Sequence, residues 1–173
     1  MSPLLLYALL LFTLLAAKKT GYEWLPTAVL VLPLFLYDER ELGLKRHKRG
    51  LITGAPFLFA GLLLYRGCPG FALKQAGVAF AEELFFRGYL MRYYSNAAVS
   101  ALFALAHFVY WGSLNALLTF FPSLLFGFLY RKSGSLWAAV LAHWGANLAY
   151  YGLLTRFPGL FGLLNRPLIE LPF

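Results

Sequence analysis

The sequence predicts an all-α membrane protein built from a bundle of about seven transmembrane helices, and two observations support this fold class. The first is composition: of 173 residues, 61% are hydrophobic and 13% are charged, whereas soluble domains have about 45–50% and about 25%. The second is patterning, because the apolar residues gather in runs of a length that suits a hydrocarbon core about 30 Å thick. A soluble enzyme is excluded, since a chain this apolar would aggregate in water.

Seven apolar runs are long enough to be membrane helices. The first is expected to be retained rather than removed as a secretory signal, because it lacks a basic start and is followed by Lys18 and Lys19 instead of a cleavage site. Breakers at 66–70 and 131–135 separate later runs. The expected helices span residues 3–17, 24–37, 51–65, 71–94, 97–111, 113–130 and 136–153.

The charge of the chain is strongly basic. Fifteen Lys and Arg against seven Asp and Glu give a net charge of +8, which in an apolar chain indicates basic loops facing anionic lipid rather than a nucleic-acid surface. The single cysteine, Cys68, excludes an internal disulfide and a cysteine-rich metal site. The positive-inside rule places the densest basic cluster in the cytoplasm, and its members are Arg40, Lys45, Arg46, Lys48 and Arg49.

A few polar side chains lie inside the apolar runs. An ionisable group at the centre of a membrane costs about 2.5–3.5 kcal/mol, so each one needs a partner or a function. They come from three of the expected helices, and we expect them to converge between those helices, at 71–94, 97–111 and 136–153. The residues are Glu82, Glu83, Arg87, His107, His143 and Asn147.

Helical spacing sorts these residues further. Glu83 and Arg87 are four apart and can form an ion pair on one face, whereas Glu82 lies about 100° around the helix and lacks that partner. His143 and Asn147 are also four apart, so they present two polar groups to one place. In the expected helix at 97–111, Phe103 lies one turn before His107, and its aromatic ring is placed to pack behind the imidazole.

The constellation suits the activation of water. A carboxylate in a poorly solvated site is a usable general base, and Glu82 fits that role, with His107 holding the water and His143 and Asn147 donating to an oxyanion. A zinc ion bound by Glu82, His107 and His143, with water in the fourth position, is an equally simple interpretation. A non-enzymatic transporter with a proton relay, or a membrane scaffold, would use the same polar cluster, although no repeated halves are evident.

Other intramembrane proteases need residues that this sequence lacks. An aspartyl mechanism requires two aspartates, whereas the sequence has only Asp38. The Gly-x-Ser-Gly turn of a serine protease and the His-Glu-x-x-His of a metalloprotease are both missing from the sequence. The protease mechanism that remains uses a glutamate together with histidines on separate helices.

Three segments in order carry a family resemblance. Residues 82–88 read Glu-Glu-Leu-Phe-Phe-Arg-Gly, residues 103–107 read Phe-Ala-Leu-Ala-His, and residues 143–147 read His-Trp-Gly-Ala-Asn. They resemble the motifs Glu-Glu-x-x-x-Arg, Phe-x-x-x-His and His-x-x-x-Asn of the CPBP (CAAX protease, or Abi) family, intramembrane glutamic endopeptidases similar to type II CAAX prenyl endopeptidases. The resemblance covers about residues 77–151.

The resemblance implies a role for each matching residue. Glu82 would be the catalytic base, His107 would position water, and His143 with Asn147 would stabilise the oxyanion. Glu83, Arg87 and Phe103 would support them, with Arg87 paired to Glu83. No cofactor or catalytic metal is implied, and zinc bound by Glu82, His107 and His143 stays the alternative.

The resemblance also implies a substrate class and an organisation of the chain. The partners would be a lipid bilayer and a membrane-anchored protein or peptide cleaved near its terminus, with no nucleic acid. We expect one multi-pass membrane domain over residues 1–173, in the plasma (inner) membrane of a prokaryote. Residues 1–65 would form N-terminal spans, 71–153 the catalytic core and 154–173 an irregular tail at the membrane interface.

Overall fold

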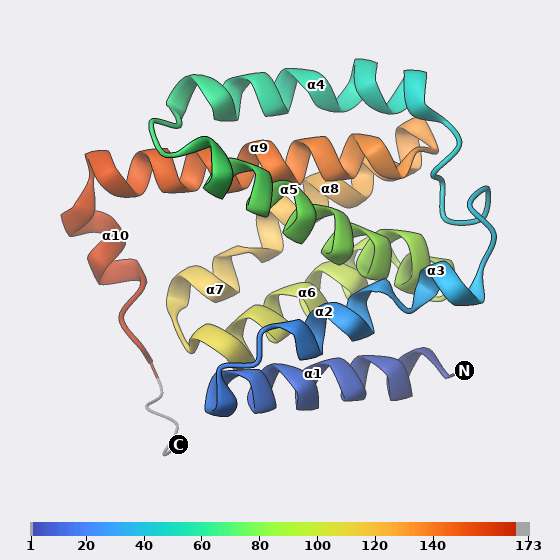
Figure 1. Cartoon of the computed structure of the whole chain (residues 1–173), viewed down its shortest axis with the longest axis horizontal. Helices are drawn as coiled ribbons and strands as arrows, with labels where there is room; N and C mark the ends of the chain where they lie inside the picture. Colours follow the sequence, from blue (N-terminus) through green and yellow to red (C-terminus); the bar gives the residue numbers. More distant parts are fainter. Residues whose placement is uncertain (1, 169–173) are drawn as a thin grey trace.

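A computed structural model, described here for residues 2–168, is a bundle of helices packed side by side (Figure 1). Within those residues the fold is all-helical, as predicted, and the β-type pairing consists of one isolated bridge between Ser113 and Pro167. The elements are α1 (Pro3–Thr20), α2 (Trp24–Val31), α3 (Pro33–Leu36), α4 (His47–Leu64), α5 (Pro69–Glu83), the π-helix η1 (Leu84–Tyr89), the 3-10 turn η2 (Leu90–Arg92), α6 (Asn96–Trp111), α7 (Leu114–Leu118), α8 (Phe120–Ser133), α9 (Leu136–Arg156) and α10 (Pro158–Leu164).

Each expected apolar run coincides with one helix or with consecutive helices, and prolines lie close to two of the breaks. Pro33, which has no N–H to donate, begins α3 directly after a break at Leu32. The run at 113–130 is divided between α7 and α8, and Pro122 lies in the first turn of α8, where a proline is tolerated. The run at 71–94 starts as α5 and continues through η1 and η2.

Several expected boundaries differ from the structure. Helices α1 and α8 each continue three residues further than expected, to Thr20 and Ser133, so α8 extends into the expected breaker at 131–135. Helix α4 begins at His47, inside the basic cluster, rather than at residue 51. The tail is also less irregular than expected, because α9 continues to Arg156 and α10 follows, starting at Pro158, whose fixed φ suits the first helical position. Beyond α10 the backbone N–H of Leu168 donates to the carbonyl of Gly112 at 2.7 Å. The last part of the expected tail, residues 169–173, lies outside the described residues.

Glycines allow α4 and α9 to pack closely side by side (Figure 1). A Cβ atom added to Gly61 would overlap the backbone of Gly145, and one added to Gly54 would lie 2.8 Å from the carbonyl oxygen of Ala138. Small residues of this kind are what lets membrane helices approach at backbone distance. The contact fixes α9, which carries two of the predicted site residues, against α4.

Buried apolar side chains form three clusters. The first joins α1, α2, η1 and α6, the second lies between α8 and α9, and a smaller third one, with Leu42, Leu84, Leu136 and Val140, joins the segment before α4 to η1 and α9. Large members of the first are Leu6, Leu10, Phe85, Phe86 and Phe103, and the second contains Phe126, Leu129, Ala138, Ala139 and Ala142.

The outer surface is apolar, as expected for a membrane protein. By length and composition, Pro3–Thr20 and Leu114–Ser133 can each cross a membrane, and Trp24–Leu36 and Asn96–Trp111 are shorter apolar helices. Soluble monomers rarely expose large apolar patches. Here large side chains from several helices are more exposed than buried, among them Phe12 (68%), Phe35 (81%), Ile52 (78%), Leu73 (71%) and Phe121 (64%).

The α4–α9 contact generates a stability prediction. We expect Gly61→Ala to destabilise the fold by about 1–3 kcal/mol, because the new methyl group meets the backbone of Gly145, which cannot move aside. Gly77→Ala in α5 is the matched control: it adds the same methyl group where nothing lies within 4 Å, and it should stabilise by up to about 1 kcal/mol. Thermal unfolding in detergent would give the melting temperatures of both variants. Equal shifts in melting temperature would contradict the close α4–α9 contact at Gly61.

Candidate active site

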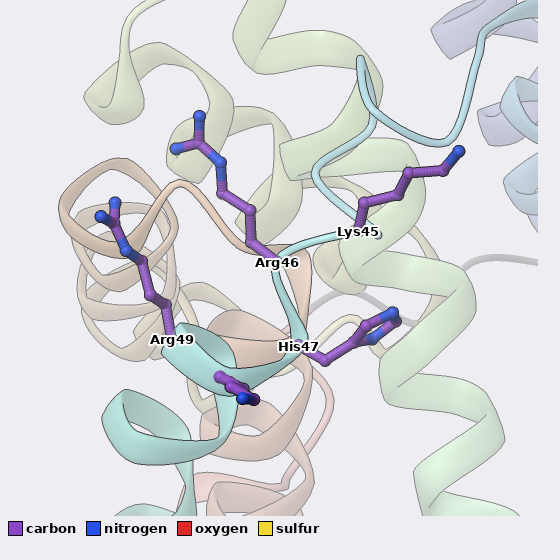
Figure 2. A pocket seen from close by; sticks show the side chains of 5 residues that line it. Lys45, Arg46, His47 and Arg49 are labelled. Atoms are coloured by element: carbon purple, nitrogen blue, oxygen red, sulfur yellow. The ribbon is translucent and has the colours of Figure 1, made fainter.

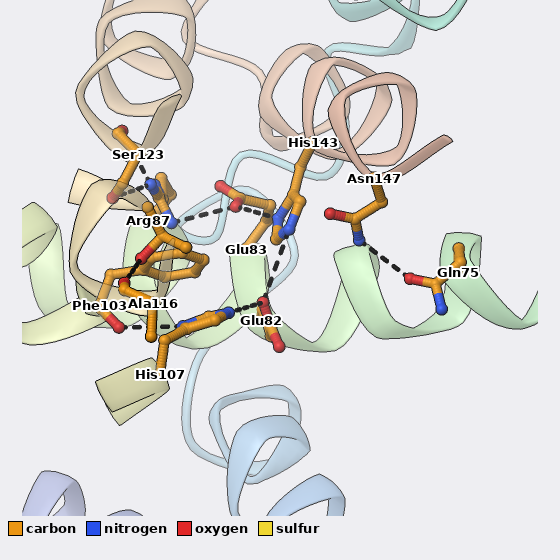
Figure 3. A network of polar contacts seen from close by, with 11 residues as sticks. Gln75, Glu82, Glu83, Arg87, Phe103, His107, Ala116, Ser123, His143 and Asn147 are labelled. Atoms are coloured by element: carbon orange, nitrogen blue, oxygen red, sulfur yellow. Dashed lines mark hydrogen bonds and ion pairs between the residues drawn. The ribbon is translucent and has the colours of Figure 1, made fainter. Parts of the chain in front are cut away.

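Five of the six polar side chains expected to converge lie together on α5, η1, α6 and α9 (Figure 3), whereas Asn147 of α9 contacts Gln75 instead. Glu82 and Glu83 end α5, and Arg87 lies in η1. His107 comes from α6 and His143 from α9. A π-helix follows the two glutamates directly, and such turns occur frequently at functional sites.

Glu83 is the centre of a fully buried network. Its Oε1 accepts a hydrogen bond from Arg87 Nη1 at 3.0 Å and another from His143 Nδ1 at 2.7 Å. The second guanidinium nitrogen, Nη2, donates to the carbonyl oxygen of Ser123 at 2.8 Å and to its hydroxyl at 2.7 Å. Neither Glu83 nor Arg87 is exposed, so this network ties α5 and η1 to α8 and α9.

The Glu82 carboxylate faces the Nε2 atoms of His143 and His107. Its Oε2 lies 3.6 Å from His143 Nε2 and 4.0 Å from His107 Nε2, distances too long for direct hydrogen bonds. This oxygen is buried without a hydrogen-bond partner among residues 2–168. Glu83 Oε2 is likewise buried without a hydrogen-bond partner among the described residues. The two glutamates differ in surroundings: Glu83 Oε1 is held by two donors, whereas Glu82 Oε2 lies between two imidazoles.

Hydrogen bonds at Nδ1 set the orientation of both imidazoles. His143 Nδ1 lies against the Glu83 carboxylate, and His107 Nδ1 lies 3.0 Å from the carbonyl oxygen of Phe103. Both partners are acceptors, so we assign the ring hydrogen of each histidine to Nδ1. Each Nε2 then faces Glu82 and is free to accept or return a proton.

Aromatic rings enclose the polar groups. Phe103 packs on His107 with ring centroids 4.3 Å apart, as the sequence predicts. Phe126 of α8 stacks on His143 at 4.8 Å. The guanidinium of Arg87 lies over both phenyl rings, at 5.1 Å from Phe103 and 5.6 Å from Phe126, an attractive cation–π arrangement.

Asn147 has a partner that sequence reasoning missed. Its Nδ2 donates to the Oε1 of Gln75 at 3.1 Å (Figure 3). Gln75 is buried in α5, seven residues before Glu82, and that spacing of two turns puts both on nearly the same face. A search of that face for amides as well as charges could have found Gln75. For Ser123 and Phe126 the sequence contains no comparable signal, because an isolated serine and a phenylalanine are ordinary in an apolar helix.

Zinc bound by Glu82, His107 and His143 is the alternative that the sequence leaves open. Tetrahedral bonds of about 2.0–2.1 Å would bring the donor atoms to roughly 3.3 Å from one another, whereas the two distances to Glu82 Oε2 are 3.6 and 4.0 Å. Within the described residues, no group of three or more His, Cys, Asp or Glu has a metal-binding arrangement. The donor atoms are therefore more widely spaced than around a bound zinc ion, and we derive no step through a metal.

The two glutamates give a matched pair of stability variants. Glu83→Gln leaves the Arg87 guanidinium buried without its bound carboxylate, and we expect it to destabilise the fold by about 3–5 kcal/mol. Glu82→Gln breaks no hydrogen bond that Oε2 makes within the described chain and should leave the melting temperature in detergent nearly unchanged. Glu83→Gln combined with Arg87→Met should recover part of the loss. Equal destabilisation by the two single variants would contradict the described network.

Comparison with protein-family models gives one match that covers the site. Residues 58–149, just over half of the sequence, match the model described as type II CAAX prenyl endopeptidase Rce1-like. The matched region includes Gln75, both glutamates, both site histidines and Asn147. Comparisons with curated proteins and with solved structures gave no match. The family match confirms the resemblance of the three motifs, and the chain belongs to the Rce1-like family of type II CAAX prenyl endopeptidases.

Proposed function

We propose that the chain is an intramembrane endopeptidase that hydrolyses a peptide bond near the terminus of a membrane-anchored protein or peptide. The family is one of peptidases. The observation that supports the site assignment is Glu82, whose buried Oε2 has no hydrogen-bond partner among the described residues and faces two imidazole Nε2 atoms.

In the proposed reaction Glu82 is the general base. A water molecule held between Glu82 and His107 loses a proton to the carboxylate, and its oxygen attacks the carbonyl carbon of the scissile peptide bond. The C–O bond forms while the carbonyl oxygen becomes an oxyanion. Glu82 then gives the proton to the leaving nitrogen as the oxyanion re-forms the C=O bond and the C–N bond breaks, which yields an amine and a carboxylic acid; the acid, which keeps the second hydrogen of the water, then loses it to solvent.

Two donors are proposed for the oxyanion. His143 that has taken a proton from solvent on Nε2 donates from Nδ1 to Glu83 and from Nε2 toward the substrate. Asn147 carries two hydrogens on Nδ2, and because one is directed to Gln75, the amide is oriented and the second hydrogen is left for the oxyanion. Gln75 therefore acts as a positioning residue for Asn147. Glu83 and Arg87 hold the His143 ring in place.

The proposed setting is a multi-pass membrane protein in the plasma (inner) membrane of a prokaryote. About seven spans would enclose the site between the helices at 71–94, 97–111 and 136–153. The exposed apolar side chains on several helices support this arrangement. Residues 1–65 would supply N-terminal spans, 71–153 the catalytic core, and 154–173 a tail at the interface that includes α10.

Glu82→Gln is expected to abolish cleavage while leaving the protein folded. The substitution keeps the size of the side chain but removes the base. The chain and its variant would be expressed in the same host, and the termini of membrane proteins would be compared by mass spectrometry; a farnesylated CAAX peptide is the defined probe in purified protein. Asn147→Ala should reduce the rate by about 10²–10³, the usual effect of losing one oxyanion donor.

Two outcomes would contradict the proposal. If membrane proteins had the same termini in cells that express the wild type and in cells that express Glu82→Gln, the Glu82 carboxylate would not perform hydrolysis. Cleavage should also continue after treatment with a chelator. If activity were lost on chelation and restored by zinc, the zinc-dependent version of the peptidase would replace the metal-free mechanism.

A further inference from the structure

A cluster of basic side chains surrounds a hollow at the end of the bundle where α4 begins. Five consecutive residues line a volume of about 490 Å³, and all five are exposed (Figure 2). We call this feature the basic hollow, and its lining residues are Lys45, Arg46, His47, Lys48 and Arg49.

The backbone that carries the basic hollow is held against the start of α9. The carbonyl oxygen of Gly43 accepts a hydrogen bond from Leu136 N at 3.0 Å, and that of Leu44 accepts one from Trp137 Nε1 at 2.8 Å. Gly50, which directly follows the lining residues in the sequence, is buried, and a Cβ atom added to it would overlap Trp137. The basic side chains therefore project from a fixed frame, which lowers the ordering cost of binding a ligand.

The positive charge of the basic hollow is largely uncompensated. Lys45 forms an exposed ion pair with Glu39 at 3.6 Å. Glu41 is already engaged by Arg92 at 2.8 Å, and this hydrogen bond holds the pKa of the Glu41 carboxyl below its usual value. Across the described part of the chain, no carboxylate pairs with the remaining cations of the hollow, which are Arg46, Lys48 and Arg49.

The start of α4 adds to this imbalance. The first turn of this 18-residue helix contains His47, Lys48 and Arg49, no acidic residue, and no side-chain cap. The N-terminal end of a helix carries a partial positive charge, so cations there are unfavourable and an anion is favourable. A bound anion would relieve both the helix end and the basic side chains.

The surface next to the hollow indicates which anion fits. One turn beyond Lys48, the exposed face of α4 becomes apolar: Ile52 is 78% exposed, and Phe59, seven residues later on the same face, is 62% exposed. A free phosphate would use only the basic end of this surface. A phospholipid would use both parts, with its phosphate in the hollow and its acyl chains along Ile52 and Phe59.

We propose that the basic hollow binds the phosphate group of an anionic phospholipid. The bound lipid neutralises the first turn of α4 and anchors the α4–α9 pair at the membrane surface. This inference does not depend on the proposed peptidase activity, because the basic hollow contains none of the residues assigned to hydrolysis.

Lipid binding by the purified full chain tests the proposal. Native mass spectrometry in a neutral detergent would compare phosphatidylglycerol with phosphatidylcholine, together with melting temperatures. The test variant is Arg46→Gln/Lys48→Gln/Arg49→Gln. The control, Lys18→Gln/Lys19→Gln/Arg156→Gln, removes the same number of exposed charges at the opposite end of the bundle (Figure 1).

We expect the wild type and the control to bind phosphatidylglycerol at least about tenfold more tightly than phosphatidylcholine, since each basic residue adds to the attraction of an anionic lipid. The test variant should lose this preference. Phosphatidylglycerol should raise the melting temperature of the wild type but not of the test variant. In lipid-free detergent the test variant should be at least as stable as the wild type, because like charges at the helix start have been removed.

Three results would overturn the proposal. A test variant that keeps the lipid preference would exclude the basic hollow as the site, and equal binding of both lipids by the wild type would exclude an anionic headgroup. The third result is obtained with inorganic phosphate at millimolar concentration. If inorganic phosphate displaced phosphatidylglycerol and raised the melting temperature as much as phosphatidylglycerol does, the ligand would be a soluble phosphate rather than a lipid.

Discussion

The buried carboxylate of Glu83 is the interaction on which the rest of the site depends. One of its oxygens accepts hydrogen bonds from both Arg87 and His143, so a single group compensates a buried guanidinium and orients an imidazole. Arg87 extends the network to Ser123 on α8. Since a buried charge that loses its partner is strongly destabilising, we expect this network to be needed for stable folding. The direction of His143 Nε2 toward Glu82 is its consequence.

Glu82 and Glu83 are neighbouring identical residues with different expected roles, Glu82 in catalysis and Glu83 in the stability of the fold. Glu83 is stabilised by its partners and is expected to act through the fold. Each glutamate has one buried oxygen without a hydrogen bond in the described chain, an arrangement that costs free energy; the oxygen of Glu82 is the one that faces the Nε2 atoms of both imidazoles. Two turns earlier in α5, Gln75 accepts a hydrogen bond from Asn147 and so orients an amide proposed to act beside Glu82.

The sequence predicted much of the fold and of the convergent polar groups, but not the details that depend on contacts between distant segments. Apolar runs located the helices because the membrane constrains their length and polarity, and helical spacing identified the Glu83–Arg87 pair. The π-helix after Glu83 and the break between α7 and α8 were not predictable from periodicity. Ser123 and Gln75 were missed because their importance comes from partners 36 and 72 residues away in the chain.

Nitrogen-15 NMR of histidine-labelled protein tests the arrangement at the centre of the site most directly, with His143→Gln used to assign the signals. We expect His143 to carry a hydrogen on Nδ1, in a hydrogen bond that Glu83→Gln alters, while Glu82→Gln shifts the Nε2 signal. A His143 ring with a bare Nδ1, or one whose Nε2 signal does not respond to Glu82→Gln, would contradict the proposed pairing of Glu82 with the two imidazoles.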